Sequence, residues 1–155
     1  MGLIKLPAPS VNLAQCVVGA WWLLSREDWT RDDQQRIDPV LGSDPIAILT
    51  YTTTHFSAQF MKRDRSGVNA EKMFTPGKNN TSAVGGYDAY FGTYNVDEQT
   101  GKVSHILLGS ITPANIGITV TRNLRADENQ LVIQLETTTT AGEPITRTLI
   151  WKRLL

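Results

Sequence analysis

The sequence predicts an all-β domain, a single antiparallel barrel of eight strands. Short runs rich in Val, Ile, Thr and aromatic residues recur along the chain, with Gly, Pro, Asn and Asp between them. Several runs alternate apolar and polar residues, so that Leu131, Ile133 and Leu135 share one face of their segment. The links between the later runs are short and polar, which favours antiparallel neighbours.

Eight segments carry this strand pattern. In chain order they are residues 17–24, 46–53, 56–63, 87–96, 102–111, 116–125, 130–138 and 145–153. Polar turns follow at 97–101, 125–129 and 141–144. A sheet of this many antiparallel strands is most stable when it closes, because closure removes both unpaired edges. A barrel of this size holds packed side chains or one small ligand.

Two segments lack the strand pattern. Residues 26–38 are strongly charged, and we expect a short helix or a polar loop at the barrel mouth whose charges form a solvated face. Residues 68–84 contain Pro76 and Gly77 and predict a surface loop with a helical turn near 70–73. Long loops in an otherwise tight meander are where a ligand entrance is expected.

Length and composition fit one domain over residues 1–155, with its core within 17–153. The 15 basic and 15 acidic residues cancel without a basic stripe, so we expect no nucleic-acid partner. The apolar stretch at 16–24 is too short to span a membrane and does not resemble a signal peptide. Cys16 is the only cysteine, which excludes an internal disulfide. We expect a cytoplasmic monomer or homodimer with no membrane association.

Two motifs at opposite ends of the chain resemble those of lipocalins. Gly19-Ala20-Trp21 matches the G-x-W of the first lipocalin strand, and Trp151-Lys152-Arg153 stands on the last predicted strand. The resemblance implies a calycin-type barrel in which Arg153 stacks across Trp21 at the closed end. A guanidinium lies well on an indole face.

Further motifs are similar to a narrower family, the lipocalin-like domain proteins of bacteria and fungi. The sequence has P-x-x-x-L-x-Y at 45–51, Y-x-G-x-Y-x-V-D at 90–97, V-x-H at 103–105 and P-x-x-x-G at 113–117, followed by Arg122. The resemblance covers residues 17–153. Some members are similar to small proteins of fungal natural-product pathways that shape reactive intermediates without a cofactor.

His105 is the first candidate site residue. It alternates with Val103 and Leu107, so we expect its side chain to point into the barrel. There a neutral imidazole could contact a ligand or act as general acid or base near neutral pH. The alternative is a core histidine hydrogen-bonded to a neighbour, and the sequence leaves both open.

Arg122 is the second candidate. It alternates with Ile118, Val120 and Leu124, and a buried cation needs a partner. That partner is either a protein carboxylate or hydroxyl group, or the carbonyl or enolate oxygen of a ligand. In the second case Arg122 would stabilise negative charge that develops on the oxygen.

Tyrosines and apolar residues complete the expected site. Tyr90 is a candidate hydroxyl donor in catalysis, although an aromatic on a strand also serves packing. Gln59 could contact a ligand or face solvent, and His55 at a hairpin is expected to be solvated. The expected ligand-binding set is Tyr51, Gln59, Tyr94, Trp21, Leu107 and Val120.

Other chemistry lacks support in the sequence. Two histidines without HxH or HExxH spacing do not predict a metal centre, and no glycine fingerprint predicts a nucleotide site. Ser104 and His105 are neighbours on a strand and point to opposite faces, so they do not form a triad. No flavin, haem or nicotinamide signature is present, and we expect no cofactor.

Three functions remain open. The first is a cofactor-independent isomerase, cyclase or dehydratase that acts on an apolar natural-product intermediate through His105, Arg122 and Tyr90. The second is a carrier that binds a small lipophilic molecule without changing it. The third is a barrel filled by its own side chains, whose surface meets another protein.

Overall fold

The computed structural model describes residues 2–66 and 83–155. Its strands are β1 (Gly19–Thr30), β2 (Gln35–Arg36), β3 (Ile46–Tyr51), β4 (His55–Met61), β5 (Tyr87–Val96), β6 (Lys102–Ser110), β7 (Thr119–Ala126), β8 (Gln130–Thr138) and β9 (Pro144–Leu154). Its helices are α1 (Leu13–Cys16) and the 3-10 turn η1 (Pro113–Asn115). Within these residues, no helix has the length and apolar character needed to cross a bilayer.

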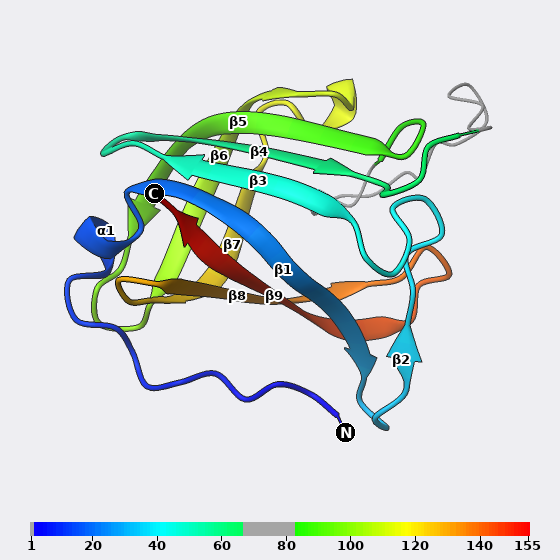
Figure 1. Ribbon diagram of the computed structural model, residues 1–155, viewed down its shortest axis with the longest axis horizontal. Coiled ribbons are helices and arrows are strands. Elements are labelled where there is room, and N and C mark those ends of the chain that lie inside the picture. The colour runs from blue at the N-terminus through cyan, green and yellow to red at the C-terminus, as the bar shows by residue number, and fades with distance from the viewer. Residues whose placement is uncertain (1, 67–82) are drawn as a thin grey trace.

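Eight of the nine strands form one closed antiparallel barrel (Figure 1). Each strand from β3 to β9 pairs with the next, β1 pairs with β3, and β1 also pairs with β9 to close the ring. Among the described strands, the two-residue β2 pairs with β1 alone. The predicted eight-stranded all-β barrel is thereby confirmed. The loop predicted at residues 68–84 lies almost wholly outside the described residues.

Strand β1 is longer than the sequence predicts. It continues to Thr30, so a helix or loop is the wrong prediction for residues 26–30. A bulge between Leu23 and Ser25 shifts the alternation by one residue. Trp21 and Leu23 face the interior before the bulge, and Asp28 is 4% exposed after it. The expectation of a solvated charged face is therefore wrong for Asp28, and for the side chain of Arg26, which is 6% exposed.

The pairing of β5 with β6 is irregular at Gly92. A bulge lies between Phe91 and Gly92, and a Cβ atom added at Gly92 would collide with the carbonyl oxygen of Ile106. Glycine is therefore required there for the close approach of the two backbones. The bulge and this close approach together add curvature to the β5–β6 wall.

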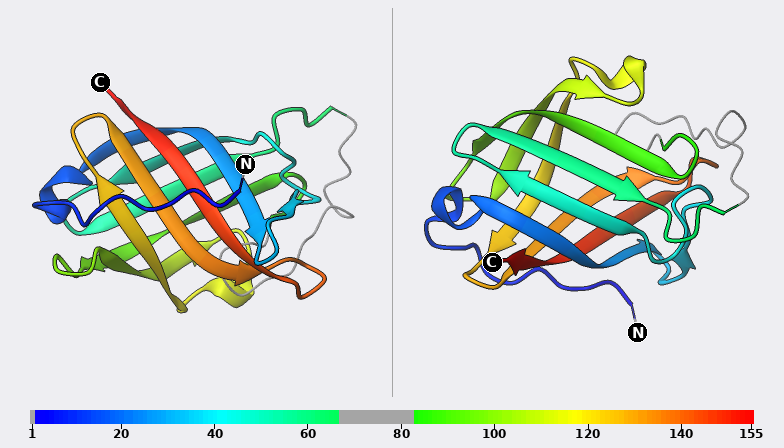
Figure 2. Two further views of the ribbon diagram at one scale, coloured as in Figure 1. Left: turned by 90° about the horizontal axis from the view of Figure 1, so that it is seen from below. Right: turned by 45° about the horizontal axis from the view of Figure 1, so that its top comes forward.

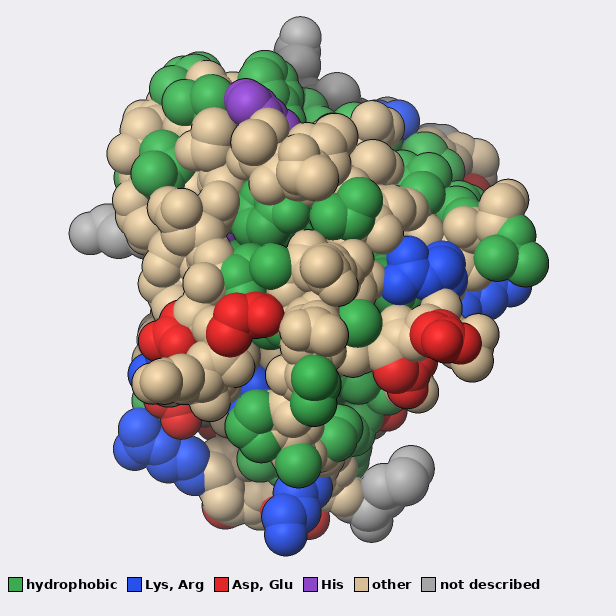
Figure 3. Space-filling view, turned by 90° about the vertical axis from the view of Figure 1, so that its left-hand side faces the viewer, with side chains coloured by type: hydrophobic (Ala, Val, Ile, Leu, Met, Phe, Trp, Pro, Cys, Tyr) green, Lys and Arg blue, Asp and Glu red, His purple; other side chains and the backbone are tan. Residues whose placement is uncertain are grey.

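The closed end of the barrel is fastened by Arg153. Its guanidinium lies 4.2 Å from the ring centroid of Trp21, as the lipocalin resemblance implies. It also donates hydrogen bonds to the carbonyl oxygens of Cys16 (2.6 Å), Val18 (2.9 Å) and Glu128 (2.7 Å). One side chain thus joins the end of α1, the start of β1 and the β7–β8 turn. Figure 3 views this end, where basic and acidic side chains are interspersed.

The N-terminal segment runs along the outside of the barrel. It crosses the outer face of β7 and β8 before it reaches α1 (Figure 2). Gln134 donates a hydrogen bond to the carbonyl oxygen of Ile4 (2.8 Å), and the backbone N–H of Ala126 donates to the Ser10 hydroxyl (2.7 Å). These bonds fix the segment to the strands beneath it.

Replacing Arg153 with lysine should weaken the closed end. Lysine cannot stack a planar guanidinium on Trp21 or reach three carbonyl groups at once, so Arg153→Lys should lower the free energy of unfolding by about 2 kcal/mol. Urea denaturation measures the change. The control is Arg63→Lys, because the Arg63 side chain is 57% exposed. Equal stability of the two variants would contradict the role given to Arg153.

Candidate functional site

The barrel encloses a cavity with an apolar wall and a charged end. The space between its lining side chains, open mouth included, is about 610 Å³. The centre of a water molecule can occupy about 60 Å³ of this space. Aliphatic and aromatic residues make most of the wall, among them Leu49, Phe56, Phe60, Ile133, Leu149 and Trp151. The polar lining residues are Arg26, Tyr51, Asp88, Tyr90, His105, Arg122 and Arg147.

Five of the residues expected in the site do line this cavity. They are His105, Arg122, Tyr90, Tyr51 and Val120, which come from β3, β5, β6 and β7. Their alternation along each strand turns them inward, as the sequence predicts. The structure therefore places all three candidate catalytic side chains in the lining of one cavity.

Four expected ligand contacts do not line the cavity. Gln59 is on the outer face of β4, where it accepts a hydrogen bond from the Tyr87 hydroxyl (2.6 Å). Trp21 lies at the closed end beneath Arg153, and Leu107 is buried in the core. The Tyr94 hydroxyl donates to the carbonyl oxygen of Thr52 (2.6 Å) and so fastens the β3–β4 turn. His55 is exposed beside that turn, as expected.

His105 is buried and bonded to Tyr51. Its Nε2 atom lies 2.6 Å from the Tyr51 hydroxyl oxygen, and Phe56 meets its ring edge-on at 4.7 Å between centroids. Burial lowers the pKa of His105 to about 3, and nearby Arg122 acts in the same direction. The imidazole is therefore neutral at neutral pH. Burial also raises the pKa of Tyr51, which keeps its phenol protonated.

Arg122 supplies a cation to the cavity wall. Burial lowers its pKa to about 10, so it stays charged at neutral pH. One of its Nη1 hydrogens is donated to the carbonyl oxygen of Thr121 (3.2 Å). Its charge acts on the hydroxyl groups of Tyr51 and Tyr90, whose pKa values it lowers against the larger effect of burial.

The charged end of the cavity rests on two buried ion pairs. Arg147 binds the carboxylate of Asp28 through Nε (2.8 Å) and Nη2 (3.0 Å). Arg26 lies 3.5 Å from Asp38, and both side chains are at most 6% exposed. The burial of Arg26 and Asp28 was missed because charged residues in a charged run look solvated, and the bulge that turns these two inward has no mark in the sequence.

Asp88 is the second functional candidate that sequence reasoning missed. It is 2% exposed and lines the cavity, and among the described residues no cation forms an ion pair with it. Burial raises its pKa to about 7, although Arg26 and Arg147 oppose this shift. The available signal was its position on β5, two residues before Tyr90 and therefore on the same face.

This arrangement can support proton transfer in an apolar space. A carboxyl group whose pKa is near neutrality can take up and return a proton, and Arg122 and Tyr90 can stabilise charge on an oxygen. Within residues 2–66 and 83–155, no three His, Cys, Asp or Glu side chains gather into a group that could hold a metal ion.

Comparison with known families agrees with the fold. A family model described as a lipocalin-like domain matches residues 18–154, which include every strand of the barrel. A search of curated proteins gives no match to this chain. A barrel of this kind suggests that a small molecule binds inside it.

Breaking the buried Arg147–Asp28 pair should cost far more stability than breaking an exposed one. Arg147→Met leaves Asp28 charged and unpaired in the interior, and we expect the free energy of unfolding to fall by about 3–5 kcal/mol. Chemical denaturation at pH 7 measures this loss.

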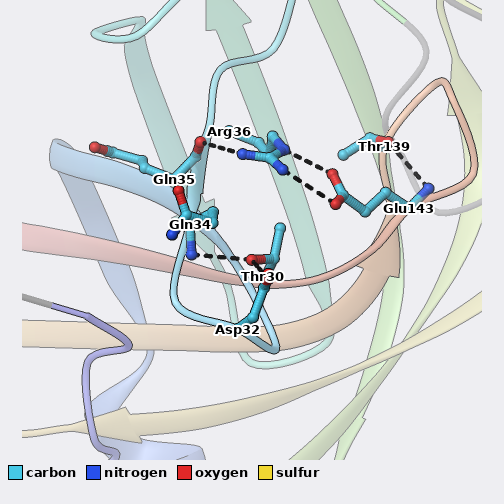
Figure 4. A network of polar contacts seen from close by, with 7 residues as sticks. All are labelled: Thr30, Asp32, Gln34, Gln35, Arg36, Thr139 and Glu143. Atoms are coloured by element: carbon cyan, nitrogen blue, oxygen red, sulfur yellow. Dashed lines mark hydrogen bonds and ion pairs between the residues drawn. The ribbon is translucent and has the colours of Figure 1, made fainter.

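The matched control is Arg36→Met. Arg36 binds Glu143 through two hydrogen bonds of 2.6 and 3.1 Å (Figure 4), but these two side chains are 40% and 39% exposed. Water screens such a pair, so the control should lose at most about 1 kcal/mol. Similar losses in both variants would show that the Arg147–Asp28 pair is not held away from water.

Proposed function

This chain belongs to the lipocalin-like domain family, and we propose that its barrel is a cofactor-independent isomerase or cyclase that moves a proton within an enclosed carbonyl compound. The observation that carries the proposal is Asp88, a buried carboxyl group on the wall of a mainly aromatic and aliphatic cavity. An apolar natural-product intermediate is the substrate class that suits this wall. We place the protein in the cytoplasm.

The proposed reaction uses the substrate and three side chains. The Asp88 carboxylate takes a proton from the carbon next to a carbonyl group, and the electron pair of that C–H bond moves onto the carbonyl oxygen. Arg122 and Tyr90 stabilise the resulting enolate oxygen. The electrons then return from the oxygen to re-form the C=O bond, the neighbouring C=C bond shifts into conjugation with it, and the displaced electron pair forms a C–H bond with the proton that Asp88 gives back at a different carbon atom.

The pKa values favour Asp88 over His105 as the base. General-base catalysis is most effective when the pKa of the base lies near the working pH. Burial brings the pKa of Asp88 to about 7 and that of His105 to about 3. In this proposal His105 stays neutral, holds Tyr51 through Nε2 and contributes to the shape of the cavity.

A carrier without catalysis is the second candidate. It is supported by the aliphatic and aromatic wall, and by the fact that Arg26 and Arg147 each have an aspartate partner already. A carrier has no need of an ionisable group at position 88. If the protein is a carrier, its ligand affinity should stay the same when Asp88 is replaced by a neutral side chain of the same shape.

A small ketone can test the proton transfer. The wild-type protein should isomerise 3-cyclohexen-1-one to 2-cyclohexen-1-one, which ultraviolet absorbance follows, and Asp88→Asn should lower the rate by about 100-fold or more. Because the base acts in its ionised form, the wild-type rate should rise with pH through about 7 and level off above it.

The control for this assay is Asp44→Asn. The Asp44 side chain is 64% exposed, so its loss should leave the rate unchanged. A wild-type rate equal to that of buffer, or an unaltered rate in Asp88→Asn, would contradict the proposed reaction. Equal binding of the ketone by both proteins without turnover would favour the carrier.

A further inference from the structure

Within the described part of the chain, the indole N–H of Trp151 has no hydrogen-bond partner. Trp151 is 1% exposed, stands on β9 and lines the cavity, and its Nε1 atom is buried. An indole nitrogen can only donate, so the missing partner must be an acceptor. Buried polar groups in folded proteins nearly always have a partner, and an orphaned one therefore calls for an explanation.

The other two buried indoles of the chain show the contrast. Trp21 donates to the carbonyl oxygen of Val17 (2.9 Å), and Trp29 donates to a carboxylate oxygen of Glu27 (3.4 Å). Neither of these tryptophans lines the cavity. The unpartnered donor is thus the one whose side chain borders space that another molecule can enter.

His105 lines the same cavity and carries a second buried ring nitrogen without a partner. Among the described residues, its Nδ1 atom makes no hydrogen bond of full geometry, although the carbonyl groups of Val103 and Val120 lie near enough to favour the protonated ring. If the Tyr51 hydroxyl donates to Nε2, only the Nδ1–H group lacks a partner. The opposite tautomer would leave both Nδ1 and the Tyr51 hydroxyl hydrogen unsatisfied, so Nδ1–H is the better assignment.

The surroundings of these donors are aromatic. Phe60 meets the Trp151 ring edge-on at 5.7 Å between centroids, and Phe56 meets His105 in the same manner. Both donors lie on the side of the cavity toward the closed end, because Trp151 pairs with Leu23 and His105 pairs with Tyr94. Asp88, by contrast, faces Arg26, Arg147 and Asp38 at the charged end. The cavity therefore offers neutral donors at one side and charged groups at the other.

We infer that the natural ligand is an apolar molecule with two oxygen functions, of which one accepts a hydrogen bond from Trp151 Nε1–H on the closed-end side. This inference rests on the proposed function for the other oxygen, the carbonyl next to the carbon that Asp88 deprotonates. The second oxygen is a carbonyl, since a neutral acceptor suits neutral donors among aromatic rings. It takes no part in the reaction and instead fixes how the ring lies in the cavity.

Two ketones of equal shape test the inference. The probes are 1,4-cyclohexanedione and 4-methylenecyclohexanone, which differ only in whether the second position carries C=O or C=CH2. The wild-type protein should bind the dione about tenfold more tightly, the effect of one net hydrogen bond. In Trp151→Phe the two affinities should converge, whereas the control Trp29→Phe should keep the difference.

Nuclear magnetic resonance supplies a readout that needs no variant. In the ¹⁵N-labelled wild-type protein, the dione should shift the Trp151 indole N–H signal downfield, and 4-methylenecyclohexanone should not. Equal affinities, an unmoved indole signal, or no binding of the dione at millimolar concentration would each overturn the inference. If the inference about Trp151 fails but the protein still isomerises the ketone, the proposed role of Asp88 stands. If the affinity difference is present but the protein does not isomerise the ketone, only the role of Asp88 is overturned.

Discussion

The pairing of β1 with β9 is the constraint on which the rest of this structure depends. It closes the barrel, and its register sets three residue pairs in order along the two strands. These pairs are Trp21 with Arg153, Leu23 with Trp151, and Asp28 with Arg147. The bulge after Leu23 lies between the second and third of these pairs. Without that extra residue, the charged half of β1 would present its opposite face, and the interior would lose its ion pairs.

The electrostatics of the cavity follow from this register. Arg26 and Arg147 are turned inward, and each is matched by one aspartate, Asp38 or Asp28. Asp88 enters from the opposite wall as a third carboxyl group and finds the nearby cations already paired. Desolvation then outweighs their attraction and brings its pKa to about 7. An acid that is useful near neutral pH arises here because Asp88 is buried and Arg26 and Arg147 are each held by another aspartate.

Much of the fold and part of the site could be predicted from the sequence. The alternation of apolar and polar residues and the turn residues predicted the barrel. Alternation alone predicted that His105, Arg122 and Tyr90 face the interior. Depth along the barrel axis leaves no trace in a sequence, so Trp21 could not be distinguished from a cavity residue. The bulge was equally invisible, because it depends on the partner strand. Asp88 shares a face with Tyr90, but an isolated aspartate on a strand gives no hint that its charge is unpaired.

The proposed chemistry requires one carboxyl group in the cavity whose pKa lies near neutral pH. Carbon-13 nuclear magnetic resonance of the aspartate carboxyl groups, recorded from pH 3 to pH 9, measures that pKa. One signal should titrate with a midpoint of about 7 and should be missing from Asp88→Asn. If every aspartate signal instead titrates near the ordinary value of about 4, the carboxyl group of Asp88 is solvated or firmly paired, and the claim is contradicted.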